Sequence, residues 1–435
     1  MRLKQITVLI SAVATAGSAA VILSPPASAD PAIAGTYNLL PVQRIVDTRH
    51  GVGAPTRPIG AGQTLAVKAT AGITGSVGVV NLTITAASPT RNGFLTAYAG
   101  STRPGVATLN FTAGESVPNS APIAVGSDGV VSIYNGSPGT VDVTVDRAGY
   151  WTGSEATVGG AFVPATPTRI ADSRQTPGTP IPARASRSVA VTGAAGVPSG
   201  ADSVVVNLGA ALPASSGYLT ATGSVTDETD DSRTSTVSFS AGRSRSNLVY
   251  VPVDSDGTIS LYNGSSAPLD YVVDIVGYII DGAATDGGSA VIASPTRIAD
   301  SRIEGGPIAA RGTRVVQIIP TDAPQGIFSA VIVHVTATRT TSSGFLTAWQ
   351  GGRRPPTSVT NFTPGVARTG TAIVPVSSTG SISLYNGSTA PVSYVIDLQG
   401  LVASEQTGAM QQATAQRRIA SVETKIRAAA RKQNR

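Results

Sequence analysis

Charged residues whose spacing could support catalysis occur in a short pattern, Arg-x-x-Asp-[Thr/Ser]-Arg, that first appears at Arg44, Asp47 and Arg49. The pattern returns twice, and each time a second acid follows near the end of the same repeat. A glycoside hydrolase needs two facing carboxyl groups, so these acids are the first candidates for chemistry. The recurrent charged residues are Arg44, Asp47, Arg49, Asp146, Arg169, Asp172, Arg174, Asp274, Arg297, Asp300, Arg302 and Asp397.

A structural role explains this pattern better than catalysis. A guanidinium group can neutralise a carboxylate through two parallel hydrogen bonds, and a motif that repeats in step with the fold serves the scaffold. We therefore expect these side chains to fasten the first strand of each repeat to its last. The chain has no cysteine, and its two histidines, His50 and His334, do not occupy corresponding positions. We predict a non-enzymatic protein with no catalytic residues and no cofactor.

Two acidic stretches of the second repeat, 227–231 and 254–257, are candidates for calcium ligands. The corresponding stretch of the third repeat, 377–380, contains no acid, so the shared feature of 254–257 is a turn. Residues 227–231 fit a solvated loop tip, because loops vary where nothing is packed against them. We therefore predict no metal site.

Two further motifs follow the charged pattern in every repeat. Gly-[Phe/Tyr]-Leu-Thr-Ala begins at Gly93, Gly217 and Gly344, and Tyr-Asn-Gly-Ser follows it each time. The chain is therefore one unit written three times. We predict units at 30–152, 161–280 and 289–402, joined by small polar linkers that act as flexible joints.

Short runs rich in Val, Ile, Thr and Tyr, bounded by Gly, Pro, Ser and Asn, predict eight strands in each unit. The expected fold is all-β, with three tandem β-sandwiches of jelly-roll or Greek-key type; an open barrel is the alternative. Asp128-Gly129 and Asn135-Gly136 should supply the positive φ of hairpin turns, so the last three strands are expected to form a meander.

The composition agrees with this class. Charged residues make up only 13% of the chain and aromatic residues 5%, while 48 Gly and 29 Pro favour turns. Without cysteine, each unit must be held by its own core. The net charge of +6 comes mostly from the two ends, which argues against a nucleic-acid partner for the repeats.

The two ends differ from the repeats. Residues 1–29 combine Arg2 and Lys4, an apolar run and an Ala-x-Ala site, which predicts a cleaved export signal; an uncleaved anchor is the alternative. No later run is long enough to span a bilayer. Residues 403–435 predict a basic amphipathic helix from about residue 414 to 431, suited to self-association or to an anionic surface; a solvated terminus is equally compatible.

A loop that differs between the units follows the strand that ends in Tyr98 or Trp349. Recognition residues vary on loops of a repeated scaffold, and an aromatic ring beside polar groups suits a saccharide. We expect a glycan site formed by Tyr98, Arg103, Trp349, Arg353 and Arg354, although core packing explains the two aromatic residues equally well.

The ordered combination of Arg-x-x-Asp-[Thr/Ser]-Arg, Gly-[Phe/Tyr]-Leu-Thr, Tyr-Asn and Val-x-Asp-x-x-Gly-Tyr resembles a repeat domain common in exported proteins of actinobacteria and other soil bacteria. That domain occurs alone, in tandem or appended to secreted hydrolases, and the resemblance covers nearly all of residues 33–402. The family pattern often has a cysteine before the first arginine, where this chain has Gln43, Thr168 and Thr296. The resemblance implies an extracellular, envelope-associated accessory module and no established catalytic residues.

These observations favour a secreted, cell-wall-associated binding or adhesion protein whose three modules recognise a polysaccharide or another surface polymer, with tandem copies raising avidity. A structural spacer or self-assembling surface subunit is the first alternative. A carbohydrate-active hydrolase that uses the paired aspartates is the second.

Overall fold

A computed structural model describes residues 32–153, 159–175, 178–223, 234–281, 290–404 and 412–433. The expected signal peptide at 1–29 and the acidic stretch 227–231 lie outside these residues, as do most of the two linkers. The described chain is all-β apart from one helix near its end.

The first eight strands form unit 1, a sandwich of two four-stranded antiparallel sheets. Its inner sheet has the order β1-β8-β3-β6 and its outer sheet the order β2-β7-β4-β5. This arrangement is a jelly roll. The strands are β1 (Ala32–Asp47), β2 (Thr64–Lys68), β3 (Val77–Ala87), β4 (Gly93–Tyr98), β5 (Leu109–Phe111), β6 (Val117–Ala124), β7 (Val130–Asn135) and β8 (Asp142–Gly153).

Units 2 and 3 repeat the same strand order, with inner sheets β9-β16-β11-β14 and β17-β24-β19-β22. Unit 2 consists of β9 (Gly160–Asp172), β10 (Ser186–Ala190), β11 (Ala201–Ala211), β12 (Gly217–Thr222), β13 (Val237–Phe239), β14 (Arg245–Pro252), β15 (Thr258–Asn263) and β16 (Asp270–Asp281). Unit 3 consists of β17 (Ala290–Asp300), β18 (Thr313–Gln317), β19 (Phe328–Thr338), β20 (Gly344–Trp349), β21 (Thr360–Phe362), β22 (Arg368–Pro375), β23 (Ser381–Asn386) and β24 (Ser393–Ala403).

The expected meander of the last three strands is wrong. Strands β6 and β8 lie in the inner sheet, whereas β7 lies in the outer sheet, so each turn carries the chain across the sandwich. Gly129 does adopt a positive φ of 71°, but Gly136 does not. A Cβ at Gly136 would instead lie 2.2 Å from Cζ of Phe94, so glycine is needed there to make room for the ring.

Alternating residues of the inner sheet serve two different cores. On β3, Leu82 and Ile84 point into the sandwich of unit 1 and are fully buried. Val79 points the other way, into a cluster shared by all three units. Each buried aliphatic side chain of this kind stabilises the fold by about 1.5–3 kcal/mol. The inner sheets are therefore buried on both faces, as in the middle layer of a larger protein.

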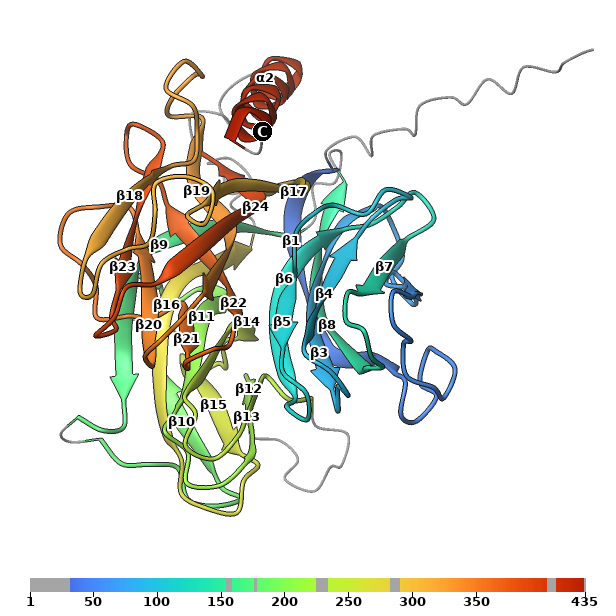
Figure 1. Ribbon diagram of the computed structural model, residues 1–435, viewed down its shortest axis with the longest axis vertical. Coiled ribbons are helices and arrows are strands. Elements are labelled where there is room, and N and C mark those ends of the chain that lie inside the picture. Colours follow the sequence, from blue (N-terminus) through green and yellow to red (C-terminus); the bar gives the residue numbers. More distant parts are fainter. Residues whose placement is uncertain are drawn as a thin grey trace, which may run out of the picture.

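The three units form one body, in which each unit contacts the other two (Figure 1). In the shared cluster, the centre of the Tyr37 ring lies 4.7 Å from that of Trp151 of unit 1 and 5.0 Å from that of Tyr250 of unit 2. Ile332 of unit 3 belongs to the same cluster. The three units therefore pack against one another. The expected flexible joints fall on linkers that lie mostly outside the described residues. The linkers are small and polar, but the apolar outward faces of the inner sheets decide the arrangement.

The C-terminal helix α2 (Gln412–Gln433) lies against unit 3, near β17 (Figure 1). Val422, Ile426 and Ala430 are at most 3% exposed and join the core cluster of that unit. Lys425 forms an ion pair of 3.2 Å with Asp322. Among the described residues, no helix combines the length and apolar character needed to cross a bilayer.

Candidate functional site

The charged pattern joins the first and last strands of every unit. In unit 1, Nε and Nη2 of Arg44 on β1 donate to the two carboxylate oxygens of Asp146 on β8 at 2.8 and 3.0 Å. Arg169 and Asp274 form the same pair at 2.7 and 3.1 Å, and Arg297 and Asp397 at 2.9 and 3.4 Å. These bidentate contacts are the strand-fastening role expected from the sequence.

The second arginine of each pattern holds the pattern's own aspartate. Nε and Nη2 of Arg49 donate to Asp47 at 2.9 and 2.7 Å, and His50 lies 3.0 Å from the same carboxylate. Arg174 with Asp172 and Arg302 with Asp300 repeat this arrangement. No hydrogen bond joins Nη1 of Arg49 to another described residue, so this nitrogen can donate to a ligand.

The pKa values of the two aspartates of each unit are shifted in opposite directions. The hydrogen bonds from Arg174 hold the pKa of Asp172 below its usual value, against the effect of burial. Burial raises the pKa of Asp274, although Arg169 opposes the shift. Acids with separated pKa values are typical of acid–base pairs, but here each carboxylate is engaged by a guanidinium and Asp274 is only 1% exposed. The arrangement suits a clamp better than a hydrolytic pair.

The charged pattern of one unit meets the Gly-[Phe/Tyr]-Leu-Thr motif of another in a cleft between the two units. The three clefts are named here by the units that form them. Cleft 1–2 is lined by Arg44, Arg49 and Tyr218, cleft 2–3 by Arg169, Arg174 and Phe345, and cleft 3–1 by Arg297, Arg302 and Phe94. Their volumes are about 490, 140 and 260 Å³.

Glycine lets the aromatic ring of each cleft lie flat on the neighbouring turn. The ring of Tyr218 covers Gly264, and that of Phe345 covers Gly387, in the same way that Phe94 covers Gly136. Each ring also lies 6.2–6.3 Å from the tyrosine that precedes this Asn-Gly pair. The contact between Gly-[Phe/Tyr]-Leu-Thr and Tyr-Asn-Gly-Ser was not predicted from the sequence. The only signal for it was that the two motifs recur together in every unit.

Cleft 1–2 is the largest of the three and is rich in hydroxyl groups. Besides Tyr218, five serines from both units line it, namely Ser116, Ser216, Ser235, Ser238 and Ser240. The Ser216 hydroxyl oxygen accepts a hydrogen bond from the backbone N–H of Ala241 at 3.1 Å, which leaves its proton free to donate. The side chain of Arg49 is 39% exposed at the opposite wall.

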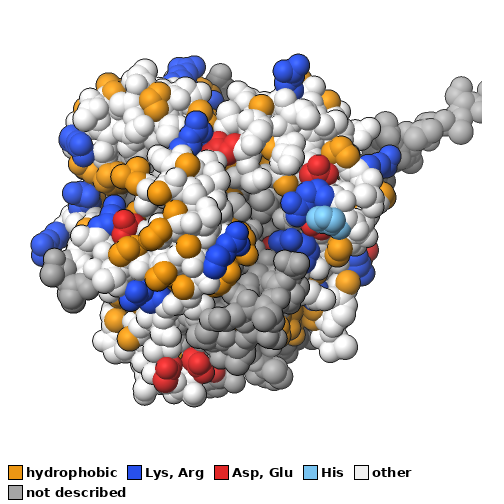
Figure 2. All heavy atoms as spheres, turned by 90° about the horizontal axis from the view of Figure 1, so that it is seen from below, with side chains coloured by type: hydrophobic (Ala, Val, Ile, Leu, Met, Phe, Trp, Pro, Cys, Tyr) orange, Lys and Arg blue, Asp and Glu red, His pale blue; other side chains and the backbone are white. Residues whose placement is uncertain are grey.

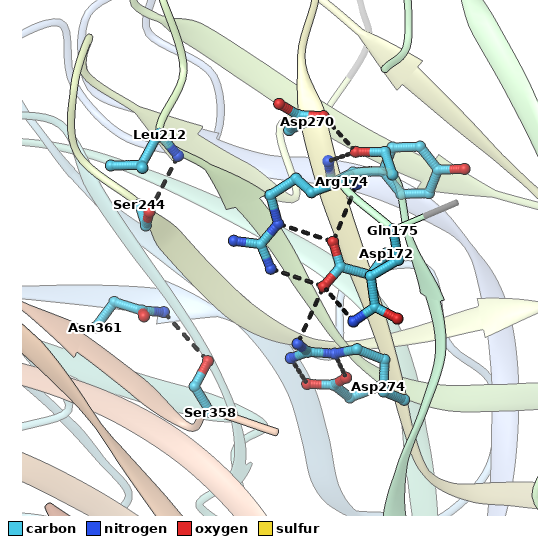
Figure 3. A network of polar contacts seen from close by, with 12 residues as sticks. Asp172, Arg174, Gln175, Leu212, Ser244, Asp270, Asp274, Ser358 and Asn361 are labelled. Carbon is cyan, nitrogen blue, oxygen red and sulfur yellow. Dashed lines mark hydrogen bonds and ion pairs between the residues drawn. The ribbon is translucent and has the colours of Figure 1, made fainter. Parts of the chain in front are cut away.

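Cleft 2–3 gathers polar groups of units 2 and 3 (Figure 3). Figure 3 shows Arg174 held by Asp172, with the third guanidinium nitrogen pointing away from that carboxylate. Across the cleft, Nδ2 of Asn361 lies 3.5 Å from the Ser358 hydroxyl. The main chain of Ser358 also contacts unit 2, because its carbonyl accepts from Asn207.

The five residues expected to bind a glycan lie at corresponding loops of two units, Tyr98 and Arg103 in unit 1 and Trp349, Arg353 and Arg354 in unit 3. Tyr98 and Trp349 are 8% and 4% exposed, so neither offers the exposed ring that this expectation required. The Trp349 indole N–H donates to the carbonyl of Gly352, in the loop that follows its strand, at 3.3 Å. Arg353 is exposed.

The two other arginines of that expected site stack on tyrosines. The guanidinium of Arg103 lies 4.3 Å from the centre of the Tyr134 ring, and that of Arg354 lies 4.1 Å from the Tyr385 ring. Arg103 also lines cleft 3–1, where it meets Arg297 and Arg302 of unit 3. The variable loop therefore contributes to an inter-unit cleft at one position.

A charged cluster ties the three units together at the contact of β6, β14 and β22. Glu115 of unit 1 accepts hydrogen bonds from Arg245 of unit 2 and Arg368 of unit 3, and Arg243 lies 3.4 Å away. Burial opposes ionisation of Glu115, but Arg245 and Arg368 outweigh it and lower its pKa. Burial and repulsion from Arg245 lower the pKa of Arg368 to about 10. Nothing in the sequence marked Glu115 as a contact between units.

His334 is another buried inter-unit group. It lies on β19 opposite Asp397, and its Nδ1 lies 3.1 Å from the carbonyl of Ala107 in unit 1. Burial lowers its pKa to about 4, so the ring is neutral at physiological pH. Asn207 occupies the equivalent position of unit 2, opposite Asp274. His334 is therefore part of an interface contact.

The carboxylates of the acidic turn 254–257 accept hydrogen bonds from residues within or directly after this turn. The carboxylate of Asp256 accepts from the backbone N–H and the hydroxyl of Thr258 at 3.0 and 2.7 Å. Within the described ranges, no three acidic or histidine side chains lie close enough together to hold a metal ion.

Basic and acidic side chains lie scattered among uncharged surface on the face shown in Figure 2. A nucleic-acid-binding surface would instead concentrate its Lys and Arg residues on one face. On this face the Lys and Arg side chains are spread over several separate places.

Comparisons with known proteins give little guidance. No protein-family model matches the chain, and no curated protein matches it. Among solved structures, the chain is similar to one of the Sulfolobus turreted icosahedral virus, at 11% identity and a TM-score of 0.15, covering 85% of this chain and 91% of that chain. A structure described as the triple jelly roll fold and turret assembly in an archaeal virus matches at 11% identity and a TM-score of 0.16, covering 86% and 91%. Likeness at these TM-scores carries no argument about this chain.

Proposed function

We propose that this chain is a non-enzymatic binding protein of the cell envelope, and that cleft 1–2 holds a saccharide unit of a surface polymer. The observation that carries the proposal is the composition of this cleft. Its volume of about 490 Å³ falls in the usual range for small-ligand sites, whereas those of the other two clefts fall below that range.

The lining of cleft 1–2 suits a polyhydroxylated ligand. Serine hydroxyls can both donate and accept, so they can match the hydroxyl groups of a sugar in either role. Arg49 presents a donor whose orientation is fixed by Asp47. The half-buried ring of Tyr218 offers a flat apolar surface for a sugar face.

The environment of the aspartates supports binding rather than hydrolysis. A general acid must reach its substrate, yet Asp146 is 1% exposed and held by two hydrogen bonds from Arg44. Asp47 is 2% exposed and held by Arg49. Both carboxylates lie behind the arginines that line cleft 1–2 and are occupied by them, so binding is the simpler role for the site.

The extracellular location rests on the sequence. The predicted export signal at 1–29 and the resemblance to repeat domains of exported actinobacterial proteins support secretion and envelope association. A single body with three clefts would meet a polymer at several points, and linked weak sites raise the overall affinity.

A glycan array probed with the chain lacking residues 1–29, followed by cell-wall pull-down, tests the proposal. Tyr218→Ala should weaken binding of the best saccharide by about tenfold or more, because it removes the ring that covers one sugar face. Phe345→Ala, the equivalent change in the smaller cleft 2–3, is the matched control and should leave that affinity unchanged.

Absence of saccharide binding would overturn the proposal, and so would equal losses in the two variants. A chain that binds no polymer but forms defined oligomers would instead favour the structural alternative. Analytical ultracentrifugation of the same sample distinguishes this result.

A further inference from the structure

We propose that cleft 2–3 is a separate binding site for a small anion, of the class of a phosphate or carboxylate group. This inference is independent of the saccharide proposed for cleft 1–2. Three arginines line a cavity of about 140 Å³, namely Arg169 and Arg174 from the charged pattern of unit 2 and Arg245 from β14. Asp274 also lines the cavity, but its carboxylate is paired with Arg169. The cavity has room for one small anionic group, since a water molecule takes up about 30 Å³.

The charge balance next to the cavity favours an anion. Three guanidinium groups, those of Arg243, Arg245 and Arg368, share the single carboxylate of Glu115. The side chains of Arg245 and Arg368 are only 9% and 3% exposed, so water compensates their charges poorly. A bound anion beside Arg245 would offset the excess positive charge.

Hydrogen-bond donors around the cavity lack acceptors. In the described chain, Nε of Arg245 is buried without a partner, and no hydrogen bond is made by Nη1 of Arg174. The Ser244 hydroxyl accepts from the N–H of Leu212 at 3.0 Å, so its own proton remains to be donated. The Ser358 hydroxyl likewise accepts from Nδ2 of Asn361, at 3.5 Å, so its proton also remains to be donated. A cluster of donors with free protons is what an anion requires.

The other two clefts differ at the residues that matter. Unit 1 has Val117 at the start of β6, where β14 of unit 2 begins with Arg245, so cleft 1–2 lacks a third arginine. In cleft 3–1 the third arginine is Arg103, which is exposed and stacked on Tyr134. Among the described linings of the three clefts, only that of cleft 2–3 contains the first arginine of such a strand, Arg245, whose side chain is 9% exposed.

Calorimetric titration with inorganic phosphate at constant ionic strength tests the site on the chain lacking residues 1–29. We expect saturable binding of one phosphate and a rise in melting temperature. Arg174→Gln should weaken phosphate binding by about tenfold, because it removes a charged donor from the lining of the cleft. Arg49→Gln, at the equivalent position of cleft 1–2, should lose saccharide affinity and keep phosphate affinity.

A second pair of variants guards against indirect effects. Arg245→Val introduces the residue found at the equivalent place of unit 1 and should abolish phosphate binding. Arg368→Val removes another arginine from Glu115 but lies outside the cleft, so a folded variant should still bind phosphate. Lack of phosphate binding by the wild type, or equal weakening by Arg174→Gln and Arg49→Gln, would overturn the proposal whatever the saccharide result.

Discussion

Arg44 on the first strand of unit 1 and Asp146 on its last strand lie directly opposite each other in the sheet and share two hydrogen bonds of 2.8 and 3.0 Å. The same pair recurs in the other two units. The Arg-x-x-Asp-[Thr/Ser]-Arg motif therefore joins the first strand to the last. Its second arginine, Arg49 in unit 1, lines a cleft. The fold and the proposed binding site therefore use the same few residues.

Replacement of Asp172 by asparagine should destabilise the protein by about 2 kcal/mol, because it removes the charged acceptor of two hydrogen bonds from Arg174. Urea unfolding measures the effect. Asp254→Asn, in an exposed turn, is the control and should change stability by less than about 0.5 kcal/mol. Normal stability of Asp172→Asn would contradict the clamp role.

The effect of Asp172→Asn should also depend on pH. The pKa of Asp172 is lower in the folded protein than in the unfolded chain, so its contribution to stability is complete above the unfolded value and is lost as pH falls through the folded value. The difference in unfolding free energy between wild type and variant should therefore shrink below about pH 3.9. A gap that stays constant down to about pH 2 would contradict this linkage.

His334 should make stability fall in mild acid. Its pKa drops from 6.5 to about 4 on folding, so the unfolded state takes up the proton first and stability declines between these two values, by at most about 1.4 kcal/mol per pH unit. His334→Asn, which introduces the residue that unit 2 has at Asn207, should keep the fold and flatten this decline. His50→Asn, which changes an exposed ring, should leave the slope in place. Equal slopes in wild type and His334→Asn would refute the prediction.

Alanine at Gly136 should destabilise unit 1 by about 1–3 kcal/mol, because its Cβ would overlap the ring of Phe94. Gly105→Ala is the matched control, since a Cβ there meets no atom within 4 Å and the backbone φ is not positive. Thermal unfolding compares the two. A neutral effect at Gly136 would show that the ring can move away from the turn.

The helix should depend on its buried aliphatic residues for its docking. Ile426→Ala removes a side chain that is 1% exposed and should free much of the helix for amide hydrogen exchange. Ser421→Ala changes an exposed position of the same helix and should leave its protection unchanged. If the helix of Ile426→Ala is as well protected as that of the wild type, the contact with unit 3 contributes little.

The sequence predicted the class of fold because the strand patterns are local. Runs such as Val79 to Thr85 alternate between two faces, and Asp-Gly marks a turn at Asp128-Gly129 and at Asp256-Gly257. The contact between Arg44 and Asp146 was also predictable, because both recur together and open and close each unit. These features depend on neighbours in sequence or on a repeat that can be read directly.

The packing of the units was not predictable in the same way. The residues that join them, such as Val79 and Tyr37, have the same types as residues of an ordinary sandwich core. Glu115 is a single acid with no recurrent partner, and its three arginines come from two other units. Tyr98 was expected to be exposed because it precedes a variable loop, but only 8% of it is exposed. Contacts of this kind depend on long-range geometry.

Small-angle X-ray scattering of the chain lacking residues 1–29 tests most directly whether the three units form one body with clefts between them. A compact protein of this length should have a radius of gyration of about 22 Å. Three separate sandwiches on flexible linkers would give a value above about 30 Å. We expect the smaller value. The larger one would contradict the single body, because the motifs of different units could then not share a cleft.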